Sequence, residues 1–315
     1  MAPAKAGSMT EIRWRLLIHG GSGAMRPGSL DPAAEQAARA GLDDALSIGG
    51  AALSDGRSAT DAAEAAVRSL EENPAFNAGR GSVLTAEGCI ELDAAIMDGR
   101  TRRAGAVAGL RTTRAPISLA RLLMDQGPHV FLSGPSADEL ARSLGLEQVA
   151  NSWFATDERR RQLDELLASG GFDDEVKYGT IGAVAVDADG HVAAATSTGG
   201  LTAKQWGRIG DSPLIGAGTY ADEVAAISAT GSGEYFIRAV AAHSVAARIK
   251  LGGVSLQQAV DDVLADIAAL GGRGGLIAVA PSGEAAFGFT TPAMYRGVAG
   301  PEGATVAVYS DSEER

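Results

Sequence analysis

Five short stretches of the sequence combine glycine with hydroxyl-bearing or charged residues, and these are the places where a reactive site is most easily built. They are HGGSG (19–23), FNAGRGS (76–82), TSTGG (196–200), GRIGDSPLIGAG (207–218) and TGSGE (230–234). Glycine lets backbone N–H groups approach a ligand closely. None of the five has the spacing of a phosphate-binding or dinucleotide-binding loop. Together they predict a site made of loop backbone and hydroxyl groups.

The usual nucleophiles are poorly represented. The single cysteine, Cys89, lies in an alternating apolar run typical of a core thiol, and there is no G-x-S-x-G turn. The four histidines are His19, His129, His191 and His243. We expect at least three of them to be structural or on the surface. A Ser-His-Asp or Cys-His centre is therefore not favoured.

A threonine that uses its own α-amino group as the base is one remaining solution, and it needs no histidine. An α-amino group titrates near ~8, much closer to neutrality than a lysine does. Thr180 begins a strand-like run after a polar stretch, in VKYGTIGAVAV. Gly179 has no Cβ, so its carbonyl is open to attack by the Thr180 hydroxyl, and cleavage there would free the Thr180 amine. From these residues alone, a β-branched residue that simply starts a strand is the plainer interpretation of Thr180.

The elements that must position these residues alternate between hairpins and helix pairs. Two hairpin patterns, at 180–197 and 275–289, enclose two amphipathic helices predicted at 233–252 and 256–270. Before them, a charged stretch at 155–178 is typical of a short surface helix followed by a flexible acidic tether. Hairpins and helix pairs favour antiparallel sheets covered by helices, a four-layer αββα sandwich, over a doubly wound parallel sheet.

Composition restricts the class of protein. The 315 residues are 45% apolar and carry a net charge of −12, which disfavours nucleic acid and anionic membranes as partners. The basic run 159–161 is flanked by acids, which is typical of a solvated helix face. One cysteine excludes an intramolecular disulfide and suits a reducing compartment. No signal peptide and no apolar run of ~18 residues is present, so we expect a cytoplasmic protein.

Several motifs, in order along the chain, resemble those of the plant-type asparaginase/isoaspartyl peptidase family of N-terminal-nucleophile hydrolases. They are IHGGSGA, NPAFNAGRGSVLT, ELDAAIMDG, YGTIGAVAVDADGHVAAATSTGG, GRIGDSPLIGAG and TGSGE, and they run from about Leu16 to Arg296. The resemblance implies one domain over 1–315, cleaved into an α subunit (1–179) and a β subunit (180–315), with a flexible linker at 155–179 before the cut. It also implies a dimer of cleaved pairs, (αβ)2.

The resemblance assigns the catalytic groups as follows. Thr180 would be the nucleophile after cleavage at Gly179–Thr180, and Thr198 would hydrogen-bond it and assist maturation and catalysis. Thr230 and Gly231 would form the oxyanion hole. Asn77 would support the surroundings of the nucleophile.

The same resemblance assigns the substrate-binding groups. Arg208 would bind the α-carboxylate of the substrate, and Asp211 its α-ammonium group. Gly231 and Gly233 would line the pocket by backbone. Trp206 stands where many relatives have proline, so the rim of the pocket is expected to differ.

The resemblance implies no cofactor for catalysis. It does imply a structural sodium ion held by backbone carbonyls of one loop, those of Leu70, Glu71, Asn73, Phe76, Ala78 and Arg80. The expected reaction is hydrolysis of L-asparagine or β-aspartyl (isoaspartyl) dipeptides to L-aspartate plus ammonia or an amino acid. The alternatives are a glycosylasparaginase-like amidase, whose nucleophile usually follows an aspartate, a protein-cutting threonine aspartase, and an uncleaved amino-acid-binding protein of the same fold.

Overall fold

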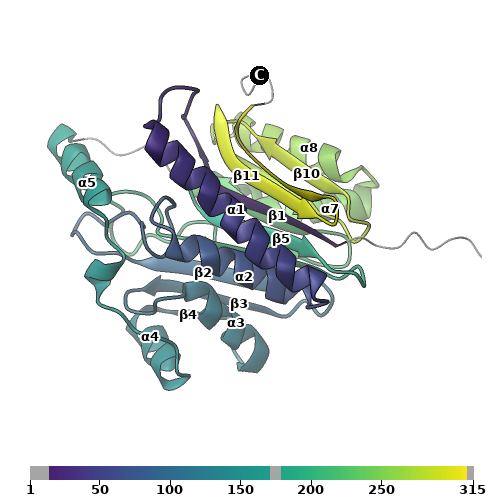
Figure 1. Cartoon of the computed structure of the whole chain (residues 1–315), viewed down its shortest axis with the longest axis horizontal. Helices are drawn as coiled ribbons and strands as arrows, with labels where there is room; N and C mark the ends of the chain where they lie inside the picture. The colour runs from purple at the N-terminus through teal and green to yellow at the C-terminus, as the bar shows by residue number, and fades with distance from the viewer. Residues whose placement is uncertain (1–13, 171–178, 311–315) are drawn as a thin grey trace, which may run out of the picture.

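Two stacked sheets form the centre of the computed structural model, which describes residues 14–170 and 179–310 (Figure 1). The larger sheet has eight strands, ordered β12 (Gly303–Tyr309), β11 (Ala293–Gly300), β1 (Arg15–Gly23), β5 (Ile181–Val186), β6 (Val192–Thr198), β2 (Leu92–Asp98), β3 (Ala104–Leu110) and β4 (Phe131–Ser133). The smaller has four, ordered β10 (Ala285–Phe289), β9 (Gly274–Val279), β8 (Ala226–Gly231) and β7 (Thr219–Ala221). Only the β3–β4 pair among these strands is parallel.

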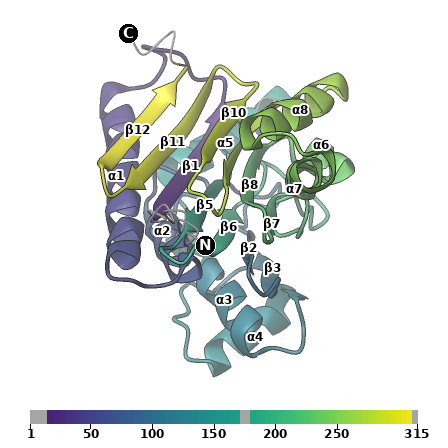
Figure 2. The same cartoon turned by 90° about the vertical axis from the view of Figure 1, so that its right-hand side faces the viewer.

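Helices cover the outer face of each sheet, which confirms the predicted αββα sandwich. The larger sheet is covered by α1 (Pro32–Ser54), α2 (Ala59–Glu72) and α3 (Pro116–Gln126). The smaller sheet is covered by α6 (Gly233–Ala239), α7 (Ala241–Gly252) and α8 (Leu256–Ala269). Figure 2 shows α1 on one side of the sheets and α6, α7 and α8 on the other. A smaller helix, α4 (Gly134–Ser143), and a single 3-10 turn, η1 (Asn151–Trp153), complete the part before α5.

The sequence of the central strands explains this layering. Every residue of β5 and of β6 is buried, because one face of these strands meets helices and the other meets the second sheet. Most of the side chains of these strands are small, which lets the layers approach closely. Two of the covering helices, α2 and α8, begin at serine caps, since the Ser58 and Ser255 hydroxyls accept the N–H groups of Asp61 and Gln258.

The charged stretch before the cut site begins with an ordered helix, α5 (Asp157–Ser169). Its first turn is capped by the Thr156 hydroxyl, and it ends at Gly170 in the left-handed conformation. Arg159 and Leu163 are buried, and Arg159 Nε donates to the Gly81 carbonyl at 2.7 Å. The linker expected over 155–179 is therefore folded in its first part, and residues 171–178 lie outside the described residues. No helix within the described ranges is both long and apolar enough to cross a membrane.

Candidate active site

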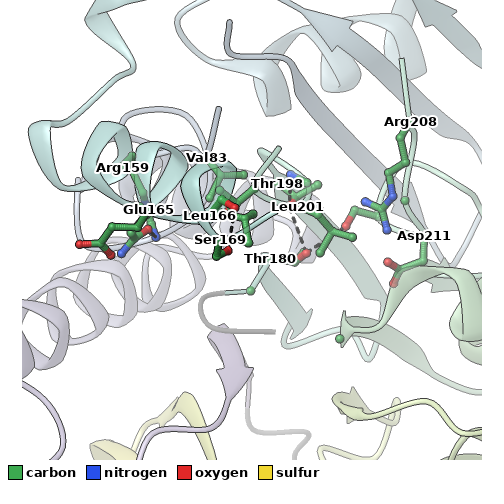
Figure 3. A pocket seen from close by; sticks show the side chains of 17 residues that line it. Val83, Arg159, Glu165, Leu166, Ser169, Thr180, Thr198, Leu201, Arg208 and Asp211 are labelled. Atoms are coloured by element: carbon green, nitrogen blue, oxygen red, sulfur yellow. Dashed lines mark hydrogen bonds between the residues drawn. The ribbon is translucent and has the colours of Figure 1, made fainter. Parts of the chain in front are cut away.

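Thr180 lies immediately before β5, between strands that fix its surroundings. Its side chain is almost fully buried, and its Oγ1 donates to Thr198 Oγ1 at 3.1 Å (Figure 3). The antiparallel register of β5 and β6 pairs Ile181 with Ser197, so Thr180 and Thr198 come to the same end of the two strands. Thr198 Oγ1 also accepts the Gly200 N–H at 3.0 Å, which fixes its orientation. The predicted partnership of the two threonines is present in the structure.

The sequence analysis missed a second hydroxyl partner of Thr180. Ser212 Oγ lies 3.3 Å from Thr180 Oγ1 and is buried. It follows Asp211 directly in the GRIGDS motif, where we considered only the charged residues. The Thr180 hydroxyl thus contacts two other hydroxyl groups.

The peptide bond before Thr180 is packed against Thr230 and Gly21, which leave no room for a side chain. A Cβ on Gly179 would lie 2.4 Å from Thr230 Oγ1, and a Cβ on Gly21 would lie 2.6 Å from the Gly179 nitrogen. Gly21 also has φ +105°, which a residue with a side chain rarely adopts. The glycine-rich end of β1 therefore lies directly against the predicted cut site.

A pocket of about 190 Å³ opens beside Thr180. Its wall combines the predicted residues Thr180, Thr198, Arg208, Asp211 and Gly231 with further groups. Figure 3 shows Arg208 and Asp211 on one side of Thr180 and side chains of α5 on the other. The α5 residues on this wall are Arg159, Gln162, Glu165, Leu166 and Ser169. The helix that precedes the predicted cut site is therefore part of the pocket wall.

Arg208 and Asp211 place opposite charges at one end of the pocket. Arg208 Nε and Nη2 each donate to the Glu234 carboxylate at 2.9 Å, so one edge of the guanidinium is already occupied. The other nitrogen, Nη1, lies against Gly210, where a Cβ would be 2.7 Å away. The sequence analysis did not identify Glu234 as a partner of Arg208, because the pair is 26 residues apart.

Asp211 is a buried carboxyl group whose charge is only partly compensated. It is 3% exposed, and its Oδ2 has no hydrogen-bond partner among residues 14–170 and 179–310. Burial raises the pKa of Asp211 to about 7, against the opposing influence of Arg208. Gly233 lies against both side chains, since a Cβ there would be 2.7 Å from Arg208 Nη2 and 2.9 Å from Asp211 Oδ1. A cationic group of a ligand would pair with this carboxylate and compensate its charge.

The two residues predicted for the oxyanion hole lie at the end of β8. Thr230 Oγ1 is fully buried and has no partner within the described part of the chain. Gly231 lines the pocket with φ +150°, and a Cβ there would lie 2.4 Å from the Arg273 carbonyl. A buried donor left unpaired is costly unless something binds it. In the uncut chain this hydroxyl lies against Gly179 and is not part of the pocket wall.

Asn77 forms hydrogen bonds with the turn after Thr198 and is not part of the pocket wall. Its Nδ2 donates to the Gly200 carbonyl at 2.8 Å, and its Oδ1 accepts the Val83 N–H at 3.0 Å. The Gly199 N–H is held by the Asn77 carbonyl at 3.1 Å. The supporting role expected for Asn77 stays a prediction.

The loop expected to hold sodium follows α2 and closes on itself. A Cβ on Gly79 would lie 2.3 Å from the Glu71 carbonyl oxygen, and one on Gly81 would lie 2.6 Å from that of Phe76. Carbonyl oxygens suit a hard cation, and each has a second lone pair even where it accepts an N–H. Glu71 also connects this loop to β6, because its Oε1 accepts from Ser197 Oγ at 2.6 Å. The donor set therefore fits such an ion, which stays a prediction.

Comparison with known proteins gives a consistent result. The family model described as Asparaginase matches residues 12–308. The chain is 46% identical to the isoaspartyl peptidase of Escherichia coli K12, over 89% of this chain and 91% of that protein. It is 42% identical to a probable isoaspartyl peptidase/L-asparaginase 2 of Arabidopsis thaliana, over 92% and 97%. It is 38% identical to the isoaspartyl peptidase/L-asparaginase of Homo sapiens, over 89% and 91%.

Proposed function

Because the chain belongs to the asparaginase family whose model it matches, we propose that it is a self-cleaving threonine amidohydrolase. Its substrates are L-asparagine and β-aspartyl dipeptides, and its products are L-aspartate plus ammonia or an amino acid. One observation carries the proposal. The Thr180 hydroxyl contacts Thr198 next to the Gly179 peptide bond, in a pocket that also contains Arg208 and Asp211.

Maturation begins with attack of Thr180 Oγ on the Gly179 carbonyl carbon. The C–N bond of that peptide breaks as the C–O bond forms, and the nitrogen takes up the hydroxyl proton. Water then hydrolyses the resulting ester, leaving a carboxylate on Gly179 and a free amine on Thr180. Before this step the Thr180 nitrogen is a non-basic amide, so the uncut chain is inert.

In the mature enzyme the free amine accepts the proton from Thr180 Oγ as the oxygen attacks the substrate amide. Asp211 binds the α-ammonium group, and the Nη1 side of Arg208 binds the α-carboxylate. The Thr230 hydroxyl and the Gly231 N–H donate to the oxygen on which negative charge develops. Ammonia or an amino acid leaves, and water cleaves the aspartyl ester.

The two subunits stay associated because their strands alternate in the larger sheet. β1 belongs to the α subunit, yet it pairs on one side with β5 and on the other with β11 of the β subunit. The (αβ)2 assembly and the cytoplasmic location stay proposals, the first resting on the resemblance and the second on the single cysteine.

Gel electrophoresis of purified protein under denaturing conditions tests the maturation step. We expect two bands for the wild type, with N-terminal sequencing of the smaller giving Thr-Ile-Gly-Ala. Thr180→Ala should give one band and release no ammonia from L-asparagine. A wild-type chain that stays whole and yet hydrolyses β-aspartyl-leucine would contradict the mechanism, and a whole chain that only binds amino acids would support the binding-protein alternative.

A further inference from the structure

A row of polar side chains lies buried behind Thr180, in the layer between the two sheets. His19, Thr196, Thr219 and Ser228 are each 0% exposed. They come from four different strands, β1, β6, β7 and β8. The rest of this layer is apolar, with Leu17, Val184 and Ile277 among its members. Polar groups placed at such depth require partners, and the substrate chemistry described above uses none of the four.

These side chains form one continuous chain of hydrogen bonds that ends on the nucleophile residue. Thr219 Oγ1 lies 2.6 Å from Thr196 Oγ1, which lies 2.7 Å from Ser228 Oγ. Ser228 Oγ lies 2.8 Å from His19 Nε2, and His19 Nδ1 lies 3.0 Å from the carbonyl oxygen of Thr180.

The direction of donation follows from the end at Thr180. The Thr180 carbonyl can only accept, so His19 Nδ1 must carry a proton. Burial lowers the pKa of His19 to about 3, although the bond to Thr180 opposes this, so the ring is neutral and Nε2 accepts. Ser228 therefore donates to His19, and Thr196 donates to Ser228. Thr219 Oγ1 faces two acceptors, Thr196 Oγ1 at 2.6 Å and the Ser212 carbonyl oxygen at 2.9 Å. Bonds aligned in one direction strengthen each other in a low-dielectric interior.

The strand that pairs with β1 at His19, β5, leaves space for this row of hydrogen-bonded side chains. β1 and β5 pair His19 with Gly182, two residues after the nucleophile. A Cβ at Gly182 would lie 2.4 Å from His19 Nε2 and 2.0 Å from Ser228 Oγ. The junction of His19 and Ser228 thus depends on a glycine in a buried strand, where that residue weakens the strand itself.

We propose that His19 is a positioning residue, whose Nδ1–H holds the Thr180 carbonyl and thereby the backbone of the nucleophile. The proposal rests on Thr180 being that nucleophile. After cleavage, Thr180 is tethered to the chain only through its carbonyl carbon, so rotation about its Cα–C bond would swing the amine and Oγ together. Thr198 holds the hydroxyl, and His19 holds the carbonyl. Misplacement of a reacting group by about 1 Å can cost on the order of 10²-fold in rate.

Two substitutions at His19 separate this role from simple packing. In His19→Asn the amide nitrogen takes the place of Nδ1 and keeps the donor to Thr180, whereas in His19→Gln it takes the place of Nε2 and loses that donor. We expect kcat for L-asparagine, per mole of cleaved chain, to stay within about tenfold of wild type in His19→Asn and to fall about 10²-fold in His19→Gln. KM should change little in either variant, because Arg208 and Asp211 are untouched. His129→Asn, at an exposed histidine, is the matched control.

Ser228→Ala provides a second measurement should either histidine variant fail to fold. It leaves His19 in place but removes the donor to Nε2, so we expect a fall in kcat of up to about tenfold with KM unchanged. Equal losses in His19→Asn and His19→Gln, or an unchanged kcat in Ser228→Ala, would overturn the proposal while leaving Thr180 as the nucleophile. A wild-type enzyme that is active without a free Thr180 amine would instead overturn the proposed function.

Discussion

Replacing Asp211 by asparagine should stabilise the protein in alkaline solution while abolishing its binding of the α-ammonium group of the substrate. The carboxyl group is 3% exposed, and burial raises its pKa from 3.8 to about 7. The folded state therefore retains a proton that the unfolded chain has lost between these two values. Stability then falls as the pH rises through this window, and it stays reduced above pH 7. The cost of the buried charge is about 4 kcal/mol, since each pH unit corresponds to ~1.4 kcal/mol.

Asparagine has nearly the same shape and no charge, so Asp211→Asn removes this cost above pH 7 and leaves stability near pH 4 almost unchanged. Each kcal/mol raises the melting temperature of a chain of this size by roughly 2–4 °C. Thermal unfolding of the variant and the wild type at pH 4.5 and pH 8.5, without substrate, measures the difference, and Asp44→Asn on the exposed face of α1 serves as control. A variant that melts at the same temperature as wild type at pH 8.5, or lower, would refute the account of Asp211 as a buried carboxylate whose charge is only partly compensated.

Three further outcomes are expected. KM for L-asparagine should rise about tenfold for each pH unit below about 7, because protonated Asp211 no longer attracts the α-ammonium group. Steady-state kinetics between pH 5 and 8 measure this dependence. A KM that does not change with pH would show that another group binds the α-ammonium group. Thr230→Ala should lower kcat by about 10²–10³-fold with little effect on KM, since in the proposed mechanism its hydroxyl donates to the developing oxyanion. An ammonia-release assay on the cleaved fraction measures both constants. A change in KM with kcat unchanged would show that Thr230 only binds substrate. Exchange of sodium for choline in the buffer should lower the melting temperature if the loop after α2 holds the ion, and an unchanged melting temperature would argue against that site.

The sequence was most informative where function depends on local motifs. Thr180, Thr198, Arg208 and Asp211 lie on one pocket, as the resemblance implied. The layered fold could be predicted because hairpin and helix periodicities are local properties of the chain. The family, too, was identifiable from motifs alone.

What the sequence could not reveal depends on strand register and on contacts across long separations. No particular role could be assigned to His19 from the sequence, because nothing in IHGG shows that β1 pairs it with Gly182, two residues after Thr180. Glu234 was overlooked because its partner Arg208 belongs to a different loop. The position of α5 against the pocket was equally invisible, since a charged amphipathic segment suggests solvent on most of its surface.

Because β1 lies between β11 and β5, the cleaved protein cannot refold in the way that the uncut chain folds. The newly made chain assembles its sheet as a single molecule, and only then can it cut itself. Once cut, a denatured enzyme must reassemble that sheet from two separate molecules, so recovery after heating becomes second order and fails on dilution. The uncut Thr180→Ala chain, still one molecule, should regain its structure at a rate independent of concentration.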